Sequence, residues 1–190
     1  MQNHKTLIIS IIAFVVLILV CIFVVQGSGN KAITYEEGVQ TAKADVDTQL
    51  SRRYNVLTEL ADCVKQYDEH EYQTLLAVIT ARGKNMSETE AEEITAQINA
   101  VAEAYPDLKS QDNYKQFMTE IATTENLIAS YKQAYNNSIK SYNRYCRSFP
   151  ARVFLGMIGY EVQQYEYYKT DRTDTEPLKL FDGGFRYSFL

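Results

Sequence analysis

The chain has 190 residues, of which 46% are hydrophobic and 12% aromatic, enough to fill the core of one compact domain besides a membrane segment. Its formal net charge is −5, which argues against nucleic acid as a partner and against broad electrostatic docking on anionic lipid, since both require a basic surface. Only 8 Gly and 3 Pro interrupt the chain, so its helices can run long.

Residues 7–25 form a run of nineteen without a charge, Gly or Pro. A helix of this length spans about 28 Å, close to the hydrocarbon thickness of a bilayer. A cleaved signal peptide is one alternative, but its apolar core is usually only about 7–15 residues long. A lipoprotein signal ending at Cys21 is another, but Val20 stands where such a signal has a small residue. The sequence therefore predicts an uncleaved single-pass anchor in the cell membrane, with lipid contacts through residues 7–25.

The orientation of this anchor stays open. Lys5 lies on one side of it, and Lys31 and Lys43 lie on the other, where Glu36 and Glu37 partly offset them. The positive-inside rule counts Lys and Arg close to the membrane, and the margin is about one charge. The side of the membrane that the C-terminal domain occupies is not decided by this count.

The rest of the chain divides by composition. Residues 1–6 are an N-terminal flank, residues 26–40 a linker, residues 41–160 a helical bundle and residues 161–190 a C-terminal tail. The linker opens with QGSGN at 26–30, which is typical of a flexible break. The tail is mostly polar, and DGG at 182–184 predicts a turn between two short apolar stretches.

Apolar residues at alternating spacings of four and three predict the helices of the bundle. The first helix is expected to run without a break to about Arg82, with Arg53 on its seam burying its stem and keeping its charged head in water. The seam residues of this helix are Val46, Leu50, Arg53, Leu57, Leu60, Val64 and Tyr67, with Leu75 and Val78 beyond them.

Two further helices follow. Gly83 is placed for a helix C-cap, and Ser87 with Glu90 forms a capping box for a second helix that ends at about Ala104, before Pro106. The third helix runs from about Ser110 to Cys146, close to 55 Å. Short connections make such helices antiparallel, so the predicted fold is all-α: an N-terminal transmembrane helix followed by an elongated antiparallel up-down helical bundle. Residues 152–160 are apolar and either cap the bundle end, the favoured interpretation, or dip towards the membrane.

No catalytic, cofactor-binding or metal site is expected. His70-Glu71 resembles the start of an HExxH zinc motif, but Thr74 stands where the second histidine would be. No glycine-rich phosphate loop and no C-x-x-C pair occur. Cys63 and Cys146 are interpreted as buried small residues, although a disulfide between them stays open. Adjacent carboxylates such as Glu92-Glu93 point away from each other on a helix and indicate a solvated face.

Several stretches within residues 40–166 together resemble the LemA family of bacterial membrane proteins. They are QLSRRY at 49–54, Tyr67 with His70-Glu71, YPDLK at 105–109, TEN at 124–126, Tyr135-Asn136, Tyr142-Asn143 and RSFP at 147–150. The resemblance implies a long antiparallel helical bundle behind a membrane anchor and brings no catalytic residues. Magnetosome proteins related to the family suggest a role in organising membrane or protein assemblies. The chain departs from the family pattern at Thr58, where Pro is usual, and at Leu127, where Arg is common.

The expected function is that of a scaffold or protein-interaction module at the bacterial membrane, without catalytic activity. The alternative is a ligand-binding or envelope-stress-sensing membrane protein, with a pocket near Tyr131, Tyr135 and Tyr142. Besides lipid, the expected partner is an unidentified membrane or membrane-proximal protein, and homo-oligomerisation stays open. The Arg52-Arg53 pair and residues 105–109 are the polar features to mutate first, although a solvated helix face and a capping turn would explain them equally.

Overall fold

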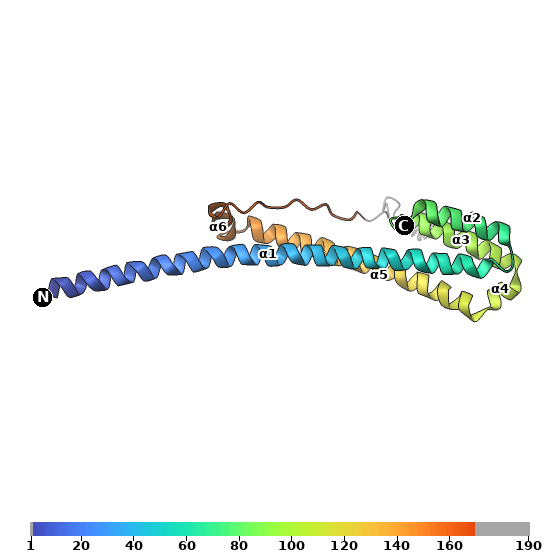
Figure 1. The fold of residues 1–190 in the computed structure, drawn as a ribbon, viewed down its shortest axis with the longest axis horizontal. Coiled ribbons are helices and arrows are strands. Elements are labelled where there is room, and N and C mark those ends of the chain that lie inside the picture. Colours follow the sequence, from blue (N-terminus) through green and yellow to red (C-terminus); the bar gives the residue numbers. More distant parts are fainter. Residues whose placement is uncertain (1, 170–190) are drawn as a thin grey trace, which may run out of the picture.

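The computed structural model describes residues 2–169, and it is an elongated bundle of helices without a strand in that range (Figure 1). Two long helices, α1 and α5, lie side by side in antiparallel directions, which confirms the predicted fold class. The hairpin of α2 and α3 packs at the end far from the N-terminus, and α6 lies at the opposite end of the bundle. The helices are α1 (Gln2–Val64), α2 (Glu69–Arg82), α3 (Glu88–Ala104), α4 (Pro106–Ser110), α5 (Asp112–Arg147) and α6 (Ala151–Met157).

Helix α1 is continuous from the apolar run into the bundle, so the flexible break expected at residues 26–30 is wrong. Glycine in a helix costs about 1 kcal/mol relative to alanine, but tertiary packing can offset that cost. Here Gly29 is buried, and a Cβ atom placed on it would come within 2.8 Å of the Ile158 side chain. Ala32 and Val39, within the expected linker, are also buried. The helix is long and apolar enough to cross a membrane, a property that a membrane anchor shares with a signal sequence.

Two exposed glycines, Gly27 and Gly38, lie within the continuous helix α1. Gly27→Ala and Gly38→Ala should each raise the free energy of unfolding by about 1 kcal/mol, because both positions are helical and an added Cβ meets nothing within 4 Å. Thermal unfolding of the full chain in detergent micelles, followed by circular dichroism, measures the change. A gain at Gly38 without one at Gly27 would mean that the helix is interrupted near residue 27.

The single long helix expected up to Arg82 is two helices. Helix α1 ends at Val64, residues 65–68 form a turn, and α2 runs back against the end of α1. Asp68 begins α2 as an N-cap, since its carboxylate accepts a hydrogen bond from the backbone N–H of Glu71 at 3.0 Å. Asp68 followed three residues later by Glu71 is a sequence pattern typical of a helix start. The apolar pattern that continues across it favoured one unbroken helix instead.

The later helix boundaries agree with the sequence. Gly83 ends α2 with a φ of +65°, a left-handed conformation that glycine adopts without strain. The capping box of Ser87 and Glu90 is present at the start of α3, which ends at Ala104 as expected. Pro106 opens the short α4, and α5 corresponds to the predicted third helix.

The buried side chains form two clusters along the bundle. The distal core joins the end of α1 to the α2–α3 hairpin through residues such as Leu57, Ile79 and Ile94. The proximal core joins the middle of α1 to α5 and α6, and it includes Tyr135 and Tyr142. Cys63 packs against the distal core and Cys146 lies in the proximal core, and both thiols are free, so no disulfide joins them.

The chain beyond α5 closes the proximal end of the bundle and then turns back. Ala151 and Leu155 of α6 are buried, as expected for a segment that caps the bundle. Residues 160–169 are extended and run back along the bundle, with Tyr160, Tyr165 and Tyr168 packed against the proximal core (Figure 1). We call residues 160–169 the C-terminal strap. The turn expected at 182–184 lies outside the described residues.

Candidate functional site

A buried arginine lies where the α2–α3 loop meets the long helices. The Arg53 side chain is 1% exposed, so the expectation that its charged head stays in water is wrong. Its Nη1 donates to both carboxylate oxygens of Glu125 on α5, at 3.3 and 3.4 Å, and its Nη2 donates to the backbone carbonyl of Met86. We call Arg53, Glu125 and Met86 the arginine joint.

The electrostatics of the arginine joint reflect its burial. Burial raises the pKa of Glu125, and the adjacent Arg53 guanidinium acts in the opposite direction without cancelling that effect. The Nε of Arg53 is buried without a hydrogen-bond partner among the described residues. A buried charge is costly unless its partners stay in place, so the arginine joint fixes the position of the α2–α3 loop on the long helices.

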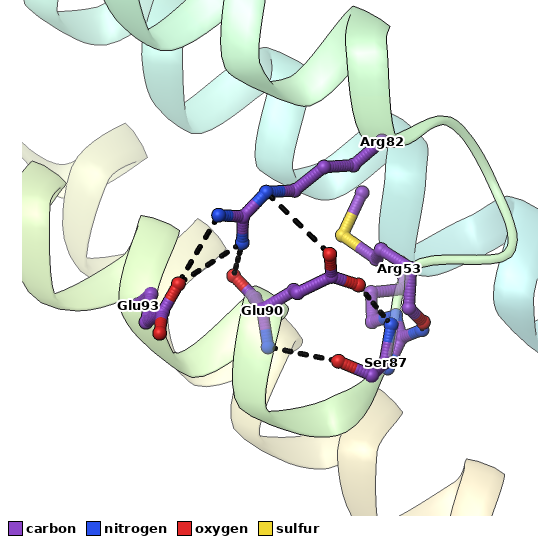
Figure 2. Close-up of polar contacts among 6 residues, drawn as sticks. Arg53, Arg82, Ser87, Glu90 and Glu93 are labelled. Carbon is purple, nitrogen blue, oxygen red and sulfur yellow. Dashed lines mark hydrogen bonds and ion pairs between the residues drawn. The ribbon is translucent and has the colours of Figure 1, made fainter.

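A second ionic cluster holds the α2–α3 hairpin closed (Figure 2). Arg82 at the end of α2 donates from Nη1 and Nη2 to Glu93 at 3.1 and 3.2 Å, and from Nη1 to the backbone carbonyl of Glu90 at 3.3 Å. The Glu90 carboxylate accepts from the backbone N–H of Ser87 at 2.7 Å, and this hydrogen bond lowers the pKa of Glu90. The charges of this cluster pair with one another, which suits a rigid hairpin.

The Arg52-Arg53 pair separates in the structure. Arg52 donates to Glu120 on α5 at 2.9 Å and is 46% exposed, while Arg53 is buried. Arg52 therefore makes an ordinary surface ion pair, and the two arginines do not form one site.

Residues 105–109 connect α3 to α5 as the C-cap residue of α3 followed by most of the short helix α4. The Tyr105 hydroxyl donates to the Asp68 carboxylate at 3.3 Å, and its ring lies 5.9 Å from the Tyr67 ring, between centroids. The backbone hydrogen bond from Glu71 lowers the pKa of Asp68, so this carboxylate is held ionised as an acceptor. These contacts fasten the start of α2 to the connection between α3 and α5.

The C-terminal strap is held by the hydroxyls of the half-buried Tyr160 and the buried Tyr142. Tyr160 donates to Glu36 of α1 at 2.6 Å, and its oxygen lies 3.2 Å from the hydroxyl oxygen of Tyr142. The backbone N–H of Gln163 donates to Tyr142 at 2.9 Å. Burial raises the pKa of Tyr160, and its hydrogen bond to the Glu36 carboxylate acts in the same direction. No sequence pattern predicts this contact, because Glu36 and Tyr160 are far apart in the chain.

The tyrosines expected to line a pocket mostly face the strap. The Tyr135 ring lies 5.2 Å from the ring of Tyr168 in an edge-on arrangement, and the Tyr142 ring lies 5.6 Å from that of Tyr165. A hollow of about 320 Å³ does exist beside them, lined by Glu88, Glu125, Ile128, Ala129, Lys132, Gln133, Asn136, Tyr168 and Lys169.

His70, Cys63 and Cys146 do not form a common site. His70 is in the first turn of α2, and among residues 10–169 no group of three or more His, Cys, Asp or Glu side chains is placed to hold a metal ion. Burial raises the pKa values of Cys63 and Cys146, which disfavours the reactive thiolate forms.

Comparison with known proteins gives the same assignment as the motifs. The sequence profile of the LemA family matches residues 42–180. The chain is 27% identical to Protein LemA of Metamycoplasma hominis in an alignment 182 residues long that covers 90% of this chain and 83% of that protein. It is also 32% identical to the magnetosome proteins MamQ 1 and MamQ 2 of Paramagnetospirillum magneticum, over 66 residues that are 35% of this chain and 24% of each of theirs. The long helical bundle and the match over residues 42–180 identify the chain as a member of the LemA family.

Proposed function

We propose that this protein is a single-pass membrane protein without catalytic activity, which acts as a scaffold or protein-interaction module at a bacterial membrane. The observation that carries the proposal is the unbroken course of α1 from its apolar run to Val64. Val64 lies thirty-nine residues beyond Val25, so the end of α1, from which the α2–α3 hairpin folds back, lies about 58 Å from the end of the apolar run. Pairing with α5 stiffens this rod.

An uncleaved anchor also accounts for the surface of α1. Its large apolar side chains between Ile11 and Val24 are exposed, and a bilayer would cover them. A signal peptide that ended with the apolar run would be cleaved near residues 25–27, which lie inside the helix a few residues before side chains that belong to the proximal core. Cleavage there would remove the span from a helix that is otherwise continuous.

Protease protection in sealed cells would give the side of the membrane that the bundle occupies.

Site-specific photo-crosslinking in native membranes tests the scaffold role. A benzophenone amino acid at Gln97, exposed on α3 in the distal hairpin, should give an adduct with the same second protein in independent preparations. The matched position is Asp45, which is exposed on α1 midway along the rod and should give little of that adduct. Adducts between copies of this chain alone, at both positions, would contradict a scaffold for another protein and favour a homo-oligomer.

The alternative, a ligand-binding or stress-sensing membrane protein, rests on the hollow beside Lys132 and Tyr168. Its volume of about 320 Å³ is at the small end of the range for ligand sites. Both Tyr135 and Tyr142 are buried against the strap, which favours the scaffold. Ala129→Phe would fill the hollow, and a scaffold should keep its Gln97 adduct after that change.

A further inference from the structure

The end of the bundle next to the apolar run carries exposed apolar side chains. Phe149 is 86% exposed and Met157 is 71% exposed, and Val153 and Ile158 are also exposed. The opposite face of α6 is buried through Ala151 and Leu155. We call Phe149, Val153, Met157 and Ile158 the apolar foot. Exposed apolar side chains gathered at one end of a bundle are typical of a surface that contacts a membrane or another protein.

Contacts with α1 give the position of the apolar foot relative to the end of the apolar run. Ile158 lies against Gly29, and the Tyr145 hydroxyl donates to the backbone carbonyl of Ser28 at 2.9 Å. Helix α5 runs towards the apolar run, and α6 lies beyond its end on the same side (Figure 1). Gly29 is four residues beyond Val25, which is about 6 Å along the helix.

This level coincides with the lipid headgroups. The headgroup layer adds about 5–7 Å to each side of the hydrocarbon core. If residues 7–25 fill the hydrocarbon core, the apolar foot lies within the headgroup layer and reaches its boundary with the acyl chains. Tyr145 lies at the same level, and tyrosine is common at membrane interfaces.

The charge around the apolar foot fits lipid headgroups. Residues 144–160 contain Arg144, Arg147 and Arg152 and no carboxylate, in a chain whose net charge is −5. All three arginines are exposed. Lys31 of α1 lies at the same end, 5.5 Å from the centre of the Tyr145 ring. Apolar side chains flanked by arginine are typical of segments that lie in the membrane interface.

We propose that the apolar foot inserts into the interface of the bilayer that α1 crosses, with the flanking arginines near lipid phosphates. This inference rests on the proposed anchor. A second attachment beside the span restricts the tilt of the rod and so fixes where the distal hairpin stands above the membrane. The chain's overall acidity does not oppose this contact, because the contact is local and mainly apolar.

Tryptophan fluorescence tests the proposal directly, because the chain contains no Trp. Phe149→Trp and Met157→Trp each place one fluorophore at an exposed position of the full chain, and Gln116→Trp places one at an exposed position near the distal start of α5. The proteins are reconstituted in phosphatidylcholine–phosphatidylglycerol vesicles, with and without lipids brominated on their acyl chains. We expect blue-shifted emission from both foot positions, and quenching by bromine several-fold stronger than for Gln116→Trp.

The possible results distinguish failure of the proposed foot contact from failure of the proposed membrane anchor. Flotation of every variant with the vesicles reports the anchor, and a chain that does not float contradicts both proposals. If the chain floats but both foot positions match Gln116→Trp in emission and quenching, the foot lies in water and the inference is wrong. Blue-shifted emission without bromine quenching would also overturn it, because a protein surface such as a second copy would then cover the foot.

Discussion

Replacing Arg53 with alanine is expected to lower the free energy of unfolding by about 3 kcal/mol, since removal of one partner from a buried ion pair leaves the other uncompensated. Glu125 would lose its cation, and the Met86 carbonyl would lose a donor. The effect is placed at the low end of the range because the Glu125 side chain is 22% exposed and water can reach it. Chemical denaturation of the full chain in detergent measures the loss.

Arg52→Ala is the matched control, one residue away in the same helix. Its ion pair with Glu120 is exposed, so the expected loss is at most about 1 kcal/mol. A double-mutant cycle of Arg53→Ala with Glu125→Ala should give a coupling of about 1 kcal/mol or more. Equal losses for Arg52→Ala and Arg53→Ala would show that the arginine joint does not hold the hairpin loop on the long helices.

Tyr160→Phe is expected to cost about 2 kcal/mol, because it removes a hydrogen bond to a charged acceptor, Glu36, in a partly buried site. Tyr142 would also lose its hydroxyl neighbour. Tyr167→Phe is the control within the same strap, since its hydroxyl is exposed and accepts one long hydrogen bond from Asn143 at 3.4 Å. That change should be close to neutral, and a similar loss from both variants would contradict a specific role for Tyr160.

The same tyrosine predicts a loss of stability at alkaline pH. A tyrosine in an unfolded chain has a pKa near 10, and burial raises the pKa of Tyr160 above that value. The folded state therefore holds this proton more tightly than the unfolded state. Its contribution to stability is fully present below about pH 10 and is lost as the pH rises from there through the folded-state pKa.

Unfolding curves between about pH 8 and pH 11 measure this dependence. The wild-type chain should lose stability more steeply than Tyr160→Phe. The variant should keep part of the slope, because burial also raises the pKa of Tyr142 and of several other tyrosines. Parallel curves would show that ionisation of Tyr160 does not differ between the folded and unfolded states.

Local interactions explain what the sequence determined. The capping box of Ser87 and Glu90, the left-handed Gly83 and the helix end before Pro106 each depend on residues within a few positions of one another. The sequence alone therefore determined the α2–α3 loop, the end of α3, the long α5 and the all-α class. The apolar run at residues 7–25 was equally clear, because the length of an uncharged stretch is a local property.

Tertiary structure decided what depends on distant partners. Residues 26–30 read as a flexible break, yet they are helical where Ile158 packs on Gly29, over a hundred residues away in the chain. The guanidinium of Arg53 was expected in water, yet it is buried and donates to Glu125 and to the Met86 carbonyl. The apolar pattern continues past residue 65 although the chain turns there. The side chains that would line one longer helix pack between α1 and α2 instead. Periodicity reports which residues are buried, but only the folded chain decides what they are buried against.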